Sequence, residues 1–158
     1  MILVRHGQSE FNVHYAKTRI DPGIVDPALT EEGRLQAQAA AEILRAHEIE
    51  RVLASPFTRT LQTAEIIAGA LKLPVEIEPL VHEHAAFIWP ESEQEEQLQA
   101  RCQRFWDLVE THAARPRTLV VTHWGFIRAL TGLRVGNGHL VRFTAPGAAE
   151  LLHPRETA

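Results

Sequence analysis

Hydrophobic residues in this chain fall into short continuous runs and longer stretches with helical spacing. The continuous runs predict β-strands at 2–4, 51–55, 75–77 and 118–122. The run at 118–122 is the clearest and is expected to lie at the centre of a sheet. Two further apolar segments, 140–143 and 149–152, flank Pro146-Gly147 and predict a closing hairpin.

The stretches with helical spacing predict helices at 31–47, 56–71 and 91–114, and a further one from about Phe126. Thr30 is a suitable N-cap for the first of them, whose apolar stripe comprises Leu35, Ala39, Ile43 and Leu44. Pro56 is expected at the first position of the second. Residues 13–27 have no sustained period and contain turn dipeptides, which predicts a functional loop.

This alternation of strands and helices predicts an α/β fold, a three-layer sandwich in which a mostly parallel central sheet is flanked by helices. With 158 residues, 45% of them hydrophobic, the chain is long enough to form a single domain, 1–158, with its own core. No repeat or low-complexity linker divides it.

The charge and cysteine content exclude several kinds of partner. A net charge of −4 without a run of Lys or Arg argues against nucleic acid. The chain begins directly on an apolar strand and contains no apolar stretch of membrane-spanning length, so we expect no membrane association and a cytoplasmic protein. Cys102 is the only cysteine, which rules out an intrachain disulfide and favours a reducing compartment. A homodimer is left open.

The segment that follows the first strand carries the most distinctive chemistry. Arg5-His6-Gly7 places a guanidinium and an imidazole at the carboxyl end of a strand, the edge where open α/β sheets bind ligands. A guanidinium matches the oxygens of phosphate or carboxylate, and a neutral imidazole can act as base or nucleophile. A buried histidine beside a solvated arginine is the alternative interpretation of the same three residues.

Other chemically suited residues lie at similar places along the chain. Arg59 falls in the first turn of a predicted helix after a strand, and His123 directly follows the strand at 118–122. A helix N-terminus attracts anions, so Arg59 is a candidate to join Arg5 in binding one. Arg19, in the predicted loop, is a candidate to reach over an anionic ligand.

His82-Glu83-His84 forms an unusual cluster of imidazoles around a carboxyl group. Two such imidazoles are candidate metal ligands, but a third ligand is missing from the sequence pattern, so no metal and no other cofactor is predicted.

Four segments together resemble the histidine phosphatase superfamily, also called phosphoglycerate mutase-like. They are Leu3-Val-Arg-His-Gly-Gln-Ser-Glu-Phe-Asn12, Leu29-Thr-Glu-Glu-Gly-Arg-Leu-Gln-Ala37, Ser55-Pro-Phe-Thr-Arg-Thr-Leu-Gln-Thr-Ala64 and Val121-Thr-His-Trp-Gly-Phe-Ile-Arg128. They occur in the family's order and span most of the chain.

The resemblance implies a metal-independent phosphatase that hydrolyses a small phosphomonoester. His6 would form a phosphohistidine, while Arg5, Arg59 and His123 would surround the phosphoryl oxygens. It also implies Asn12 and, as a weaker candidate, Ser9 as phosphate-binding groups. We expect a backbone carbonyl to hold the proton on one nitrogen of His6, and we expect His123 to be protonated.

Glu83 matches the family's proton donor, with His82 and His84 as competing candidates. The chain departs from the family after this residue, where His84-Ala-Ala-Phe-Ile-Trp89 stands. Three alternative functions stay open: a phosphohistidine protein phosphatase, a phosphoglycerate mutase, and a phosphate-binding module without catalysis. Family mutases are longer, which favours hydrolysis here.

Overall fold

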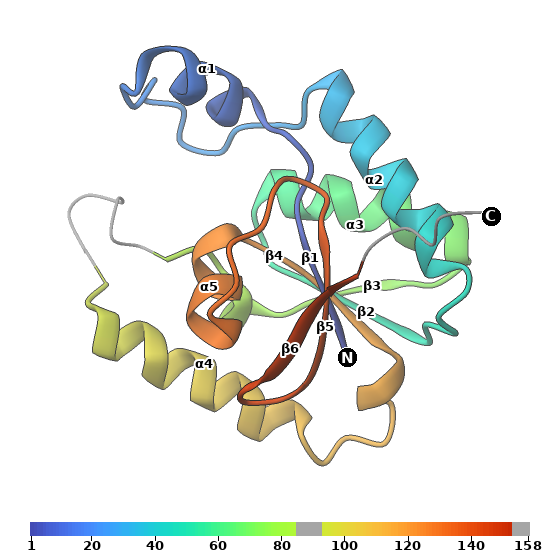
Figure 1. Ribbon diagram of the computed structural model, residues 1–158. Helices are drawn as coiled ribbons and strands as arrows, with labels where there is room; N and C mark the ends of the chain where they lie inside the picture. Colours follow the sequence, from blue (N-terminus) through green and yellow to red (C-terminus); the bar gives the residue numbers. More distant parts are fainter. Residues whose placement is uncertain (85–92, 153–158) are drawn as a thin grey trace.

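A mixed sheet forms the centre of the computed structural model, which describes residues 1–84 and 93–152 (Figure 1). Its strands are β1 (Ile2–Arg5), β2 (Arg51–Ala54), β3 (Val75–Ile77), β4 (Thr118–Thr122), β5 (Leu140–Ala145) and β6 (Ala148–Leu152). Their spatial order is β3-β2-β4-β1-β5-β6. The first four strands are parallel to one another, whereas β5 is antiparallel to β1 and β6 is antiparallel to β5. The predicted parallel sheet, its central β4 and its closing hairpin are thus confirmed.

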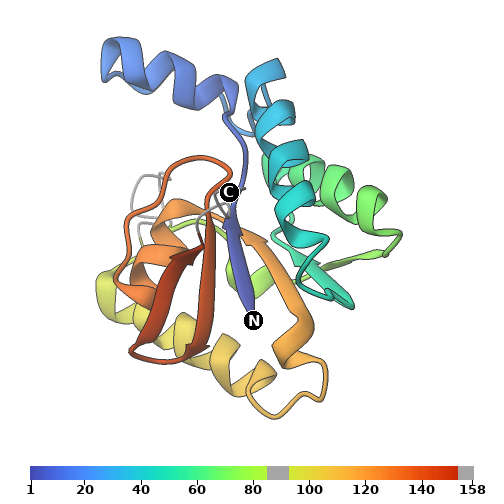
Figure 2. The same ribbon diagram turned by 45° about the vertical axis from the view of Figure 1, so that its right-hand side comes forward.

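Helices cover both faces of this sheet (Figure 2). One face carries α2 (Glu31–Leu44) and α3 (Thr58–Leu71), and the other carries α4 (Glu95–Val109) and α5 (Trp124–Thr131). Among the described residues, two short 3₁₀ turns are present: η1 (Pro79–Val81), which follows β3, and η3 (Arg115–Arg117), which directly precedes β4. The predicted three-layer sandwich is confirmed. Within the described ranges, no helix has both the length and the apolar character that crossing a bilayer requires.

The period of a strand explains how two cores form from one sheet. Ile2 and Val4 of β1 point into the core beneath α2 and α3, while Leu3 points into the core beneath α4 and α5. In the same way, Val120 of β4 points into the core beneath α4 and α5, whereas Leu119 and Val121 point into the core beneath α2 and α3. Since both faces are buried, the strands are continuously apolar instead of alternating.

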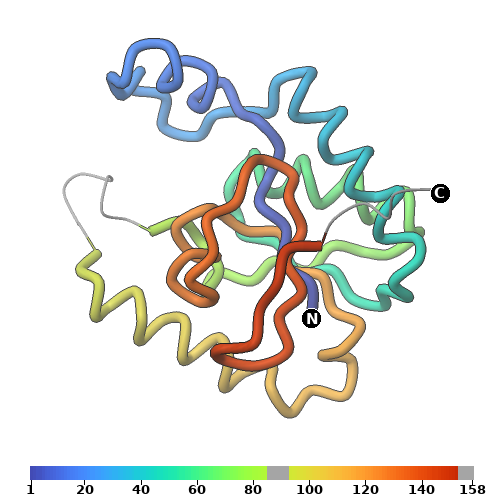
Figure 3. Tube along the Cα trace, viewed as in Figure 1, coloured from blue at the N-terminus to red at the C-terminus, as the bar shows by residue number. Residues whose placement is uncertain are grey.

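The predicted loop at 13–27 is wrong for its first part, where the chain forms α1 (Glu10–Thr18). Ser9 is the N-cap of this helix, and its side chain forms a capping box with Asn12. No residue of α1 is buried, so the helix has no apolar stripe from which it could have been predicted. The chain trace leaves the sheet edge after β1, runs outward through α1 and returns to α2 (Figure 3).

Other helix limits also differ from prediction. Helix α3 begins at Thr58, so Pro56 precedes it and is not its first residue. The start of α3 is instead capped by a residue distant in sequence. Asp26 accepts hydrogen bonds from the Thr58 backbone N–H and hydroxyl, at 3.0 and 2.6 Å. Helix α4 ends at Val109, the last apolar residue of its buried face, well before residue 114. Residues 91–92 of its predicted start lie outside the described residues.

The predicted apolar stripe of α2 is partly wrong, since Leu35 is 50% exposed. The buried face consists of Gly33, Ala37, Ala40, Ala41 and Leu44. Small residues on this face let the helix approach the chain closely. At its first turn, Gly33 packs against the backbone of Gly7 and Gln8, and a Cβ on Gly33 would overlap the Gln8 carbonyl oxygen.

We expect the substitution Gly33→Ala to destabilise the fold. The added methyl group forces α2 away from the segment that follows β1, and such overpacking costs about 1–3 kcal/mol. Thermal unfolding of the variant measures this loss. The matched control is Gly69→Ala in α3, where a Cβ meets no atom within 4 Å. Replacing that exposed helical glycine is expected to raise stability by about 0.5–1 kcal/mol, and equal losses in both variants would contradict this packing argument.

Candidate active site

Three adjacent parallel strands end at the same level and deliver their next residues to one place. Arg5 of β1 is in register with Thr122 of β4, and β2 continues the alignment on the other side of β4. The backbone N–H of His6 donates to the Thr122 carbonyl at 3.0 Å. The residue after β4 is His123, and its ring centroid lies 5.3 Å from that of His6. The two histidines predicted at strand ends are therefore neighbours.

The ring of His6 has defined surroundings at both nitrogens. Nδ1 lies 2.7 Å from the Gly7 carbonyl oxygen, which accepts a hydrogen bond, so the proton of the neutral ring is on Nδ1. Nε2 then has a free electron pair, which accepts a hydrogen bond from Arg59 Nε at 3.3 Å. Burial, followed by the positive charge of Arg59, lowers the pKa of His6 to about 3. His6 is neutral at physiological pH.

Two guanidinium groups face this ring. Arg59, in the first turn of α3, also lies over the Phe57 ring, with its Cζ 5.1 Å from the ring centroid. Arg5 is held from behind by the Val135 carbonyl, which accepts a bond from Nη1 at 3.0 Å. The Nε atom of Arg5 is buried and has no hydrogen-bond partner. Such an unpaired donor is costly unless an anion binds there.

His123 is fully buried, and only one of its two ring nitrogens has a hydrogen-bond partner among the described residues. Nε2 lies 2.8 Å from the Ser55 hydroxyl, whereas Nδ1 has no partner. Burial and the neighbouring His6 and Arg59 keep the pKa of His123 well below its ordinary value. The expectation of a protonated His123 is therefore wrong for the free protein. When the Ser55 hydroxyl donates to Nε2, the single ring proton lies on Nδ1 as a second unpaired donor.

Glu83 joins the same cluster from the segment after η1. Its Oε1 accepts hydrogen bonds from the backbone N–H groups of His84 and Gly125, at 2.7 and 2.9 Å. Burial raises the pKa of the Glu83 carboxyl, although these two bonds and the attraction of Arg59 and Arg5 act to lower it. A Cβ on Gly125 would overlap Oε1, so only glycine lets the carboxyl approach the start of α5. We call Arg5, His6, Arg59, Glu83 and His123 the strand-end cluster.

The remaining predicted site residues lie outside this cluster. Ser9 and Asn12 cap α1, and the Asn12 Oδ1 accepts bonds from the Ser9 hydroxyl and from Asn137 Nδ2, at 3.0 and 3.2 Å. Arg19 is the exposed C-cap of α1, at the outer end of the helix, with its guanidinium over Tyr15. Among the described contacts, none joins Arg19 to the cluster.

Several residues that the sequence analysis did not select hold the cluster in place. Thr63 Oγ1 accepts from the Gly7 N–H at 3.1 Å, and Asn137 Nδ2 donates to the His6 carbonyl at 3.2 Å. Thr122 Oγ1 donates to the Val81 carbonyl at 2.5 Å. Arg101 binds the carbonyls of the segment that carries Glu83. These are ordinary polar residues on helices, a loop and the end of β4, so local sequence gives no signal of their role.

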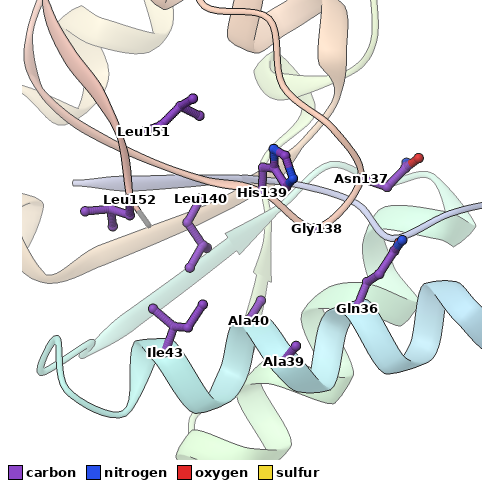
Figure 4. Close-up of a pocket in the computed structure, with 10 residues that line it drawn as sticks. All are labelled: Gln36, Ala39, Ala40, Ile43, Asn137, Gly138, His139, Leu140, Leu151 and Leu152. Carbon is purple, nitrogen blue, oxygen red and sulfur yellow. The ribbon is translucent and has the colours of Figure 1, made fainter. Parts of the chain in front are cut away.

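A pocket of about 360 Å³ lies behind the segment that follows β1, between α2 and the β5-β6 hairpin (Figure 4). Apolar side chains line one part of it, including Ile43, Leu140 and Leu152, while Gln36 and Asn137 lie toward the His6 segment. Gln36 accepts a hydrogen bond from the Gln8 N–H at 2.8 Å. None of the lining residues belongs to the strand-end cluster, so this pocket is separate from the cluster. Its residue Gln36 instead helps to hold the segment that follows β1.

The two histidines beside Glu83 each contact a backbone oxygen. His82 Nδ1 lies 2.8 Å from the Glu83 carbonyl, and His84 Nε2 lies 3.0 Å from the Glu93 carbonyl. In the described part of the chain, no three His, Cys, Asp or Glu side chains are grouped as a metal ion requires.

Comparison with known proteins supports the resemblance found in the four motifs. The family model of the histidine phosphatase superfamily (branch 1) matches residues 1–89 and 81–148. The chain belongs to this superfamily. Both matched stretches contain parts of the strand-end cluster, including His6 in the first and His123 in the second.

Curated relatives match about half of this chain. A probable phosphoglycerate mutase GpmB from Proteus mirabilis is 42% identical over 81 residues, which are 51% of this chain and 36% of the relative. Phosphoserine phosphatase 1 from Hydrogenobacter thermophilus is 39% identical over 75 residues, 48% of this chain and 34% of the relative. The matches thus cover about a third of the length of each relative.

Solved structures share the fold over nearly the whole chain. A mycobacterial glucosyl-3-phosphoglycerate phosphatase in complex with VO3 has a TM-score of 0.74 at 21% identity, covering 96% of each chain. Phosphoserine phosphatase from Entamoeba histolytica in complex with 3-phosphoglyceric acid has a TM-score of 0.74 at 20% identity, covering 96% of this chain and 94% of that one. These similarities establish a phosphoglycerate mutase-like fold.

The lowered pKa of His6 predicts how stability depends on pH. The unfolded chain binds a proton at His6 near pH 6.5, whereas the folded protein does so only near pH 3. Because the unfolded state binds more protons in this window, the free energy of unfolding falls as the pH drops through it. For His6 alone the loss from pH 6.5 to 5 is about 2 kcal/mol.

Denaturant unfolding of wild type and His6→Gln at several pH values measures this contribution. The variant is expected to lose less stability on acidification, because position 6 no longer titrates. The exposed His14→Gln serves as the control and should follow the wild type. Parallel curves for wild type and His6→Gln would show that His6 is not buried in its neutral form.

Proposed function

We propose that this protein is a phosphatase that hydrolyses a small phosphomonoester through a phosphohistidine on His6. One observation carries the proposal. The ring of His6 holds its proton on Nδ1 against the Gly7 carbonyl, so its Nε2 electron pair faces the Arg59 guanidinium, in a cluster where Arg5 Nε and His123 Nδ1 are buried donors without a partner. A nucleophilic nitrogen opposite donors suited to phosphate is what phosphoryl transfer requires.

Three donors of the strand-end cluster are suited to bind the oxygens of a phosphoryl group carried by Nε2. Arg5 Nε and His123 Nδ1 are buried without partners, and Arg59 Nε reaches the same nitrogen of His6. A phosphate oxygen would take the Arg59 donor from Nε2 and leave the electron pair free to attack. Because His6 and His123 are buried and the two arginines are partly buried, the charges act at a lower effective dielectric constant than in solvent, where they stabilise a phosphoryl dianion more strongly.

In the first step, Nε2 attacks phosphorus in line with the ester oxygen. The P–N bond forms, the P–O bond to the leaving group breaks, and the leaving oxygen takes a proton from the Glu83 carboxyl. Burial raises the pKa of this carboxyl, which favours the protonated acid that the step needs. The negative charge that develops on the phosphoryl oxygens is shared by the guanidinium groups of Arg5 and Arg59.

In the second step, a water molecule attacks the phosphohistidine. The Glu83 carboxylate accepts a proton from this water, the P–O bond forms and the P–N bond to His6 breaks. Inorganic phosphate leaves, and the acid is regenerated. The two backbone N–H groups that bind Glu83 Oε1 stabilise its carboxylate between the steps, so one carboxyl group serves both as acid and as base.

The substrate class rests on the size and charge of the cluster. Five ionisable side chains suit one phosphoryl group, and the catalytic set is complete without a metal or another cofactor. Asn12 and, more weakly, Ser9 stay predicted phosphate-binding groups, and Arg19 stays a predicted contact to an anionic ligand. A cytoplasmic location, a homodimer, and the absence of nucleic acid or membrane partners also stay predictions.

Release of inorganic phosphate from a panel of phosphomonoesters tests this function. The panel contains p-nitrophenyl phosphate, phosphoserine, sugar phosphates, a phosphohistidine peptide, and 3-phosphoglycerate with and without 2,3-bisphosphoglycerate. We expect turnover of small esters in the presence of chelator. We further expect no turnover by His6→Ala, and a loss of about 10²–10³ in kcat for Arg59→Ala, as for removal of one transition-state donor.

Arg45→Ala, at the exposed end of α2 and paired with Glu42, is the control and should retain wild-type activity. Isomerisation of 3-phosphoglycerate without phosphate release would establish the mutase instead. Hydrolysis restricted to the phosphohistidine peptide would establish the protein phosphatase. Phosphate binding without turnover of any compound would leave only the binding module.

A further inference from the structure

Arg101 is the most deeply buried cation in the described structure, and the reaction proposed above does not use it directly. It lies on α4, and only 3% of its surface is exposed. Its Nε and Nη2 bind the two carboxylate oxygens of Glu93 at 2.8 and 2.9 Å. This is a bidentate ion pair in which neither side chain is well solvated, with 4% and 13% of the two side chains exposed.

The remaining donors of Arg101 point to the segment that carries Glu83. Nη1 donates to the carbonyls of Leu80 and His82, at 2.6 and 2.8 Å, and Nη2 donates to the Glu83 carbonyl at 3.3 Å. One guanidinium therefore holds three carbonyls of the four-residue stretch 80–83, which belongs to no strand and whose regular structure is limited to the short η1 turn. The Phe126 ring supports it from α5, with the Arg101 Cζ 5.4 Å from the ring centroid.

The same stretch is fixed at only a few other points. Thr122 donates to the Val81 carbonyl, and Glu83 Oε1 is bound by the two backbone N–H groups of His84 and Gly125. Of the contacts to the backbone between Leu80 and Glu83, those of Arg101 are the most numerous from any one side chain of the described chain. Glu93 in turn fixes the orientation of the guanidinium plane.

We infer that Arg101 is a positioning residue for the proton donor, which holds Glu83 in line with the leaving group through three backbone carbonyls. The inference rests on the proposed function, because it assigns Arg101 the task of orienting the acid of that reaction. Lysine cannot replace it. An ammonium group has no planar fork, so it cannot bind both oxygens of Glu93 and three carbonyls on the other side together.

The dependence of rate on the leaving group separates positioning from general damage. A phenolate such as p-nitrophenolate leaves without help from an acid, whereas an alkoxide requires a proton. We therefore expect Arg101→Lys to lower kcat/KM for an alkyl phosphate at least about tenfold more than for p-nitrophenyl phosphate, since small misplacement of a catalytic group is costly. Glu83→Gln should show the same preference, with a loss on the alkyl ester of about 10²–10⁴.

A double variant tests whether Arg101 acts through Glu83. Once Glu83 is glutamine, the position of the side chain no longer matters for proton donation. Arg101→Lys/Glu83→Gln is therefore expected to hydrolyse the alkyl ester no more slowly than Glu83→Gln alone. Losses that multiply in the double variant would overturn the inference, as would equal losses on both esters in Arg101→Lys.

Two further variants keep the test decisive. Glu93→Gln leaves Arg101 in place but weakens its ion pair, and we expect the same leaving-group preference at smaller size even when Arg101→Lys folds poorly. The exposed Arg104→Lys on the same helix should behave as wild type. If His6→Ala keeps wild-type activity, the proposed function itself is overturned. If activity depends on His6 but neither the Arg101 nor the Glu93 variant shows a leaving-group effect, only the role of Arg101 is overturned.

Discussion

The parallel register of β1, β4 and β2 is the constraint on which the site depends. In this register the strands end side by side, and the residues that follow them meet at one edge. The backbone bonds from His6 to β4 and from Ser55 to β4 continue the ladder by one residue beyond the strands, at 3.0 and 3.1 Å. The proposed nucleophile and its neighbours thus directly follow strands that helices bury on both faces, and side chains placed by such elements are held more precisely than side chains on loops.

Burial at this edge determines the protonation states of the two histidines and of Glu83. It lowers the pKa of both histidines and raises that of Glu83, so that the imidazoles are neutral and the carboxyl holds its proton more readily. The cationic charge is left to the two arginines, whose guanidinium groups stay charged in proteins. In the proposed mechanism, the roles of nucleophile, acid and charge stabilisation thereby fall to different groups through one physical cause, the burial of the cluster.

Sequence patterns predicted the elements that bury apolar side chains and missed the one that does not. Strands buried on both faces and the helices over them have strong patterns, and His6, Arg59 and His123 could be selected because each follows such a strand. Helix α1 buries no residue, so only its capping box could have revealed it. In α2, glycine and alanine form most of the buried face. Because these residues are small, the pattern of larger apolar residues predicted Leu35 on that face instead, although Leu35 is exposed.

Contacts between distant segments are the part of the site that the sequence alone does not contain. Arg101 and Asn137 reach the cluster from α4 and from the turn before β5, and nothing near them in sequence indicates that they do so. The pKa of His123 was misjudged for the same reason. Its value depends on how completely the folded chain surrounds the ring, which is a property of packing and not of the motif.

The nitrogen that carries the phosphoryl group tests the central claim most directly. Rapid quenching of the wild type during turnover of p-nitrophenyl phosphate, at alkaline pH to preserve phosphohistidine, followed by peptide mass spectrometry and ³¹P NMR, identifies both the residue and the ring atom. Because Nδ1 of His6 is bound to the Gly7 carbonyl, the account predicts a phosphoryl group on Nε2 of His6. A phosphoryl group on Nδ1, on another residue, or on none during active turnover would contradict it.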